Sequence, residues 1–111
     1  MEQLNRIELA GRIGTIKIFP VGDTRMARFS LATEVTYRDK QGTPIIETTW
    51  HNVSAWAGSL RQNLDSLAKG DCVYVIGRIR TSRFTASDGS ERTVYEVVAS
   101  VVERINADQK F

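Results

Sequence analysis

Residues 71–105 read DCVYVIGRIRTSRFTASDGSERTVYEVVASVVERI. This stretch predicts two β-strands, over residues 71–85 and 93–105, on either side of the turn sequence ASDGS at residues 86–90. Asp-Gly between two strand-like segments is a strong signal for a β-hairpin, because glycine adopts the positive φ that a tight turn requires. We therefore expect the last third of the chain to be β-structure.

Three further strands are expected upstream, over residues 5–13, 25–38 and 45–57. In the first two, apolar and polar residues alternate with a period of two, which is typical of a strand with one buried face. The third is rich in β-branched and aromatic residues. Turn residues separate the three strands, around Pro20 and Gly22 and again over residues 39–44.

One short helix is predicted, over residues 59–69, with Gly70 in place to end it. Three leucines form its apolar stripe: Leu60, Leu64 and Leu67. The order of elements is three strands, one helix and two strands, without the β-α-β alternation of a parallel sheet. We expect an all-β fold: five antiparallel strands in a Greek-key barrel of the OB type, with one short helix between strands 3 and 4. Such barrels bind oligonucleotides or oligosaccharides.

The size and composition of the chain limit the classes of protein to which it can belong. The chain has 111 residues, a formal net charge of +2 and a single cysteine, Cys72, so an intramolecular disulfide is excluded. We expect one domain over residues 1–105 and a short polar C-terminal end, residues 106–111, with no long acidic tail. No apolar run approaches the roughly 20 residues of a membrane span. We expect a cytoplasmic protein that has no membrane partner.

Catalytic signals are weak. His51 and Cys72 are the only residues of their types, and they fall on different predicted strands. Nothing nearby supplies the base and orienting group that a nucleophile needs. Gly11 and Gly14 lack the pattern of a phosphate-binding loop. We expect no enzyme activity, cofactor or metal, and a structural His51 in the sheet or at a subunit contact. A small hydrolase that uses His51 is the alternative.

The two tryptophans break the expected pattern of burial. Trp50 and Trp56 are six residues apart on one predicted strand, so they project from the same face, about 20 Å apart. Asn52 and Ser54 lie between them on that face, and the opposite face carries His51, Val53 and Ala55. The largest residues thus share the more polar face, which favours a binding platform. The alternative is that one tryptophan packs under a loop or in a subunit interface.

Aromatic and basic residues also meet on the two predicted hairpins. Tyr37 is followed by Arg38 and Lys40, and Phe84 follows several arginines in a segment, residues 78–86, that contains no acid. Either cluster alone is more simply a solvated hairpin arm. Together with the tryptophans they suit single-stranded nucleic acid, whose bases stack on aromatic rings while cations contact the phosphates. The candidate phosphate contacts are Arg12, Lys40, Arg78, Arg80 and Arg83.

Five segments, in order, resemble the bacterial single-stranded DNA-binding protein family. They are IELAGRIG (7–14), FSLAT (29–33), TWHNV (49–53), KGDCVYVIGRIRT (69–81) and EVVA (96–99). The resemblance runs over residues 5–105. It implies an OB barrel that assembles as a homotetramer and wraps DNA, whose bases stack on a few aromatic residues. These map here to Tyr37, Trp50, Trp56 and Phe84.

The resemblance also implies a function. We expect sequence-independent binding and protection of single-stranded DNA in replication, recombination and repair, in the nucleoid. Family members recruit replication and repair proteins through an acidic tip, in place of which this sequence ends Asp-Gln-Lys-Phe. The alternative is a dimeric OB assembly protein like the primosomal replication protein. Residues 15–20 differ from the family pattern, so Phe19 is expected to pack against another subunit or to extend the platform.

Overall fold

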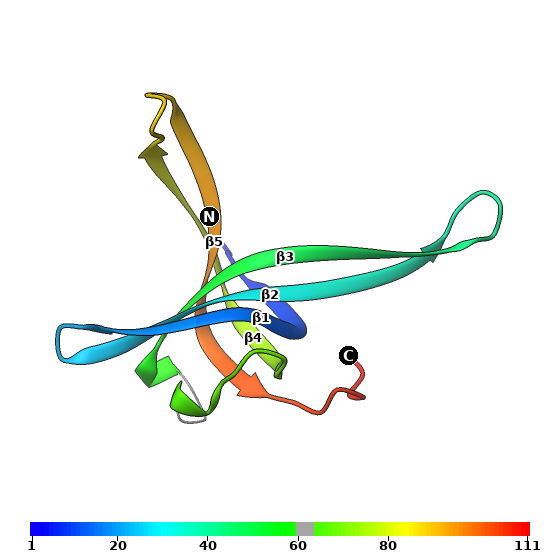
Figure 1. Cartoon of the computed structure of the whole chain (residues 1–111), viewed down its shortest axis with the longest axis horizontal. Helices are drawn as coiled ribbons and strands as arrows, with labels where there is room; N and C mark the ends of the chain where they lie inside the picture. Colours follow the sequence, from blue (N-terminus) through cyan, green and yellow to red (C-terminus); the bar gives the residue numbers. More distant parts are fainter. Residues whose placement is uncertain (60–63) are drawn as a thin grey trace.

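A computed structural model describes residues 1–59 and 64–111 of the chain. Five long β-strands make up most of the structure (Figure 1). They are β1 (Ile7–Val21), β2 (Thr24–Arg38), β3 (Pro44–Trp56), β4 (Cys72–Thr85) and β5 (Glu91–Arg104). The predicted all-β class is confirmed, and the Asp-Gly turn joins β4 to β5, with Gly89 at a φ of +86°.

The strands close into a barrel in the order β1-β2-β3-β5-β4. All neighbouring strands are antiparallel except β3 and β5, which are parallel and pair Val53 with Val97 and Ala55 with Ala99. The expectation of five antiparallel strands was therefore wrong at this contact. The reason is geometric: a closed ring with an odd number of strands cannot alternate direction all the way round. One parallel pair is unavoidable.

The predicted helix over residues 59–69 is not seen in the described part of the chain. Two single turns of 3₁₀-helix occur instead, η1 (Ala57–Ser59) and η2 (Leu64–Ser66), and residues 67–69 are irregular. Leu60 lies outside the described residues. Leu67, with 4% of its surface exposed, packs into the core. Asp71 holds the end of this connection by accepting hydrogen bonds from the Ala68 amide and from Arg104. A segment this short has only a weak helical preference of its own, and its described residues form no α-helix.

β1 continues to Val21, well beyond the predicted end at residue 13. A β-bulge between Ile13 and Ile16 explains the difference. Ile13 is buried, and after the bulge Ile16 and Ile18 pack against the core, so the inward-facing positions change from odd to even numbers. Because the bulge shifts the alternation of apolar and polar residues by one position, the sequence on its two sides does not show the single period of two that predicts one continuous strand.

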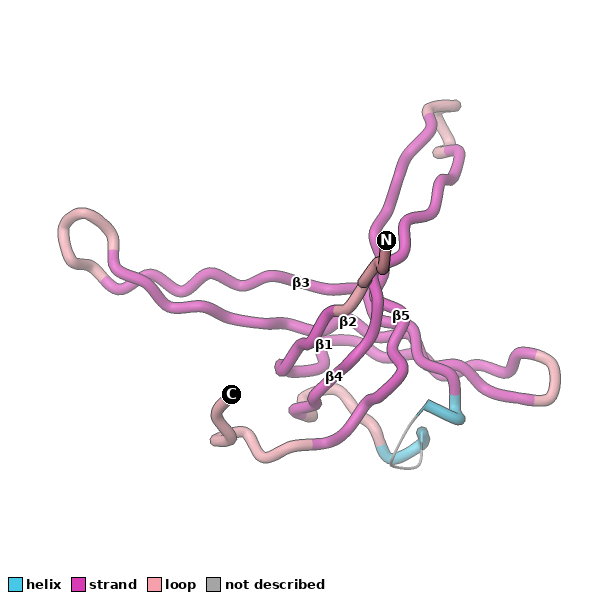
Figure 2. The backbone as a smooth tube through the Cα atoms, turned by 180° about the vertical axis from the view of Figure 1, so that it is seen from behind, coloured by secondary structure: helices cyan, strands magenta, loops and turns pink. Residues whose placement is uncertain are grey.

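Three hairpins extend from the barrel as arms (Figures 1 and 2). They are formed by β1 and β2, by β2 and β3, and by β4 and β5. The core lies where the strands cross, and its side chains come from all five strands and the connection before β4: Ile13, Ala27, Phe29, Leu31, Val53, Ala55, Leu67, Val73, Val75, Val97, Ala99 and Val102. No helix in the described ranges is long and apolar enough to span a membrane.

Candidate nucleic-acid interface

Both tryptophans lie on the outer face of β3. Trp50 is 60% exposed and Trp56 38%, whereas Val53 and Ala55 on the other face are buried in the barrel. This is the arrangement that the alternation of the sequence predicts. In this chain neither indole is sequestered in the core.

The outer face of the sheet is organised in rows that run across β1, β2 and β3. One row is apolar: Phe19 on β1 pairs with Met26 on β2, which pairs with Trp56 on β3. The next row is basic and polar, and it consists of Lys17, Arg28 and Ser54.

Two further pairs on this face lead from the basic row to the second tryptophan. Asn52 on β3 pairs with Ser30 on β2, and Trp50 on β3 pairs with Ala32 on β2. A polar strip with two cations therefore separates the two indoles.

A groove of about 370 Å³ follows this strip, with the β4–β5 hairpin as its other wall. The residues that line it are mostly polar: Thr15, Arg28, Phe29, Ser30, Asn52, Val53, Ser54, Arg80, Ser82, Val94, Tyr95 and Glu96. Its floor and walls thus offer hydroxyl, amide and guanidinium groups beside the tryptophan face.

Glu96 is the acid of this groove. It accepts a hydrogen bond of 3.0 Å from the Ser54 hydroxyl, and its other oxygen lies 2.6 Å from Nη2 of Arg80. Residues 78–86 contain no acid, but β5 places Glu96 directly opposite Arg80. Arg80 is therefore neutralised by a cross-strand partner that the local sequence did not reveal.

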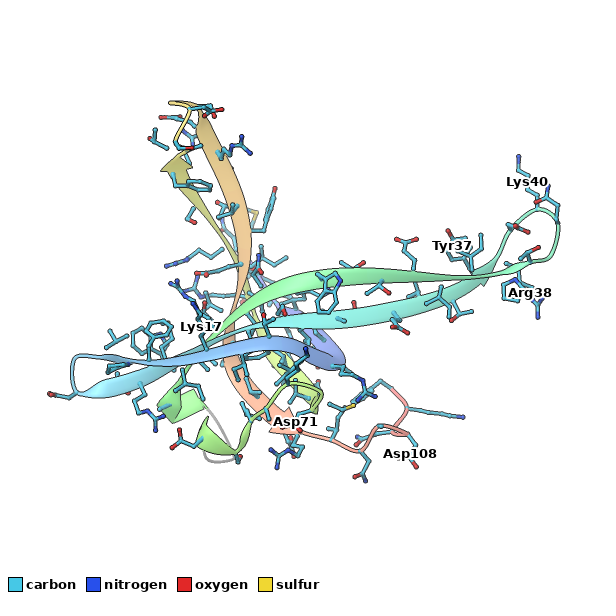
Figure 3. The ribbon with its side chains drawn as sticks, in the orientation of Figure 1. Lys17, Tyr37, Arg38, Lys40, Asp71 and Asp108 are labelled. Carbon is cyan, nitrogen blue, oxygen red and sulfur yellow. The ribbon has the colours of Figure 1, made fainter. Side chains whose placement is uncertain are left out.

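The other predicted phosphate contacts are exposed and form no ion pair with any described residue. Arg12 donates a hydrogen bond of 2.8 Å to the Gly70 carbonyl oxygen. It lines a hollow of about 690 Å³ together with Trp50 and Lys69. Lys40 lies at the tip of the β2–β3 arm, as Figure 3 shows. The remaining two are Arg78 and Arg83 on β4.

Tyr37 and Phe84 lie out on the arms, 48% and 47% exposed. Tyr37 is near the end of the β2–β3 arm (Figure 3), on the ribbon face opposite to that of Trp50. Phe84 is near the end of the β4–β5 arm and has the same strand parity as Arg80 and the groove residue Ser82. The structure thus brings Trp50 and Trp56 onto one face, and it spreads the other two aromatic residues over separate arms.

Three residues of this surface were missed by the sequence reasoning. Tyr95 is 68% exposed and lines the groove, and it shares a second cavity, of about 170 Å³, with Trp50 and Asn52. Lys17 and Arg28 belong to the basic row. Parity places Arg28 on the outer face with Ser30, and this signal was available in the sequence. The outward position of Lys17 could not be predicted because it depends on the bulge in β1. The place of Tyr95 beside Trp50 could not be predicted because it depends on the parallel pairing of β5 with β3.

His51 lies beside the site but has no catalytic arrangement. Its Nε2 is 2.9 Å from the Thr33 hydroxyl, and no described acid forms a hydrogen bond with it. Burial lowers the pKa of His51 below its ordinary value, so the imidazole is neutral near pH 7. Among the described residues, no cluster of His, Cys, Asp or Glu could hold a metal ion.

The closed five-stranded barrel with an open aromatic and basic face defines an OB-fold binding protein. The chain belongs to the single-strand binding protein family, whose profile matches residues 4–105. It is 33% identical over 105 residues to the single-stranded DNA-binding protein of Neisseria meningitidis, and equally identical to that of Xylella fastidiosa. These matches cover 92% of the chain but only 60% and 63% of the two relatives.

Two solved structures are similar over nearly their whole length. The Plasmodium falciparum SSB complex with ssDNA has a TM-score of 0.79 and 28% identity, over 96% of this chain and 98% of that one. The small single-stranded DNA-binding protein of Streptomyces coelicolor has a TM-score of 0.71 and 25% identity, over 98% and 100%. Both extend the family likeness to the arrangement of the strands.

Proposed function

We propose that this protein binds single-stranded DNA without regard to sequence. The observation that carries the proposal is the outer face of β3, where Trp50 and Trp56 are exposed on either side of a polar strip. Bases that stack on exposed rings contribute about 1–3 kcal/mol each, and every base offers a π-face. A site of this kind does not distinguish one base from another, and it performs no chemical step.

The comparisons support this proposal. The curated relatives are named single-stranded DNA-binding proteins, and the Plasmodium falciparum neighbour was solved as a complex with ssDNA. In this chain Phe84 would add a stacking ring on the β4–β5 arm, and Tyr37 would add one on the opposite face of the β2–β3 arm. Arg12, Lys40, Arg78 and Arg83 would contact phosphates, and Arg80 would do so only after it exchanges Glu96 for the DNA.

The cellular role that we propose is protection of single strands during replication, recombination and repair. The proposal includes assembly as a homotetramer in the cytoplasm, which rests on the resemblance of the chain to the single-stranded DNA-binding protein family. Light scattering measures the mass directly. Four copies support the proposed assembly, whereas two copies favour an arrangement like that of the primosomal replication protein.

Titration with poly(dT) tests the binding proposal through the intrinsic fluorescence of the two tryptophans. Strong quenching is expected, because the indoles would stack on bases. The binding constant should fall steeply with salt as counterions are released. A duplex of the same total charge is the control and should quench weakly, because its bases are already stacked. If poly(dT) causes no quenching at low salt, the stacking proposal is wrong.

A further inference from the structure

We propose that Lys17, Phe19 and Arg28 form a second part of the binding surface, which we name the hairpin patch, on the β1–β2 arm. It would take single-stranded nucleic acid that leaves the tryptophan face at Trp56. The inference rests on the proposed function and extends it to an arm that the four stacking residues do not include.

The bulge in β1 creates the patch. Beyond it, Ile16 and Ile18 pack against the core, so the residues between and after them, Lys17 and Phe19, point outward. Arg28 lies directly opposite Lys17 on β2, on the same face. Figure 3 shows Lys17 on β1 near the point where the arm leaves the barrel. Two exposed cations and a half-buried aromatic ring thus share one strip of the arm.

The contacts of Arg28 show how the patch would work. Its guanidinium carbon lies 5.6 Å from the centre of the Phe19 ring, within the range of a cation–π contact. Arg28 and Lys17 form no ion pair with any residue in the described ranges. Arg25, on the same arm, is engaged differently, since both of its terminal nitrogens bind the Asp65 carboxylate. One arginine of the arm therefore secures the connection before β4, while Arg28 and Lys17 keep their charges available.

The patch is continuous with the tryptophan face. The row Phe19–Met26–Trp56 and the row Lys17–Arg28–Ser54 each cross all three strands, and Arg28 itself lines the polar groove. A guanidinium stacks on a base through its plane, while its charge and that of a neighbouring cation neutralise the adjacent phosphates. The pairing of a planar cation with an aromatic ring beside Trp56 favours a nucleic-acid strand over an acidic protein segment as the occupant.

The experiment compares wild-type protein with the Lys17→Gln/Arg28→Gln double variant. Both are titrated with oligo(dT) of about 6 and about 16 nucleotides, which lie in the lower part and at the upper end of the range of OB-fold site sizes. The control variant is Arg6→Gln/Lys110→Gln, which removes an equal number of positive charges near the ends of the chain. Each titration is repeated over a range of salt concentrations, and urea unfolding checks that the variants are folded.

We expect the double variant to lose affinity for the long oligonucleotide and to lower the salt slope by about 1.4, since each lost phosphate contact on a single strand contributes about 0.7. The control should keep the wild-type slope. If the double variant keeps that slope at both lengths, the inference is overturned and the proposed function stands. If wild-type protein binds neither oligonucleotide, the proposed function is wrong, and the inference that the hairpin patch binds single-stranded DNA is wrong as well.

Two further readouts separate the parts of the proposal. Arg28→Lys keeps the charge and removes the planar group, so it should retain the salt slope and weaken binding several-fold. Binding equal to wild type would rule out a base stacked on Arg28. A double variant that binds DNA normally but no longer retains poly-glutamate would assign the patch to an acidic peptide instead.

Discussion

A Cβ atom on Gly14 of β1 would stand 2.5 Å from Cζ3 of Trp50 on β3. It would also stand 2.8 Å from the hydroxyl oxygen of Ser30. The indole of Trp50 therefore rests against bare backbone, and this glycine sets its position on the outer face. The ring is exposed, yet one edge lies against β1, two strands away in the barrel.

Gly14→Ala should weaken single-stranded DNA binding, because the added methyl group displaces the Trp50 ring from its seat. We expect a loss of several-fold in affinity for oligo(dT) and a shift in tryptophan emission in the free protein. Gly58→Ala is the matched control, since a Cβ at Gly58 meets nothing within 4 Å. Equal affinity of the two variants for oligo(dT) would show that the position of the Trp50 ring against Gly14 does not matter for DNA binding.

Trp50→Ala should reduce the free energy of binding by about 1–3 kcal/mol, the usual contribution of one stacked base. Trp50 is more exposed than Trp56, so its removal should leave the fold and the assembly intact. Gel-shift titration gives the affinity, and light scattering gives the mass. Trp50→Phe should recover most of the lost affinity. A Trp50→Ala protein that binds like wild type would show that this residue is structural.

Glu96→Gln should strengthen binding to oligo(dT). The carboxylate occupies Arg80 and the Ser54 hydroxyl at the centre of the groove, and its loss frees the guanidinium for a phosphate. The salt slope should rise by about 0.7, as expected for one additional phosphate contact on a single strand. Glu2→Gln, at the exposed N-terminus, controls for the change in net charge. An unchanged slope in Glu96→Gln would exclude Arg80 from phosphate binding.

Stability should fall as the pH is lowered through the range in which His51 titrates. Burial lowers the pKa of this imidazole in the folded protein below its ordinary value of 6.5. As the pH falls below that value the unfolded chain takes up the proton first, so stability is lost until the folded pKa is passed. Urea midpoints at about pH 7.5 and about pH 5.5 measure the change.

His51→Gln is the control for this pH dependence. Glutamine does not titrate, and its side chain can still form a hydrogen bond with the Thr33 hydroxyl. The midpoints of the variant should therefore differ less between the two pH values than those of the wild type. The carboxylates Glu8 and Asp65 have pKa values lowered by Tyr74 and Arg25, respectively, and titrate below this window. An identical pH dependence in the variant would assign it to other groups.

Local patterns in the sequence predicted the strands and the tryptophan face well. Alternation along residues 45–57 placed Trp50 and Trp56 outside and Val53 and Ala55 inside, as the structure has them. The Asp-Gly turn was equally local. Each of these signals depends on neighbours a few residues away, and such neighbours are visible in a single sequence.

Features that depend on distant pairing could not be predicted in the same way. The bond between Arg80 and Glu96 arises from the register of β4 against β5, and the place of Tyr95 in the groove arises from the meeting of β5 with β3. The helix over residues 59–69 was expected from the leucine spacing. Leu67 packs into the barrel core, as expected of a residue on the apolar stripe, but the described residues 64–69 contain only one 3₁₀ turn.

The parallel contact of β3 with β5 has a consequence for the way in which the chain reaches its native state. Each arm is a hairpin of neighbouring strands, and hairpins form within microseconds. The seam of Val53 to Ala55 with Val97 to Ala99 joins segments far apart in the sequence, so its loop-closure entropy is large. We expect the arms to be ordered early and the seam to close late. Amide exchange during refolding should protect the arm hydrogens before those of the seam.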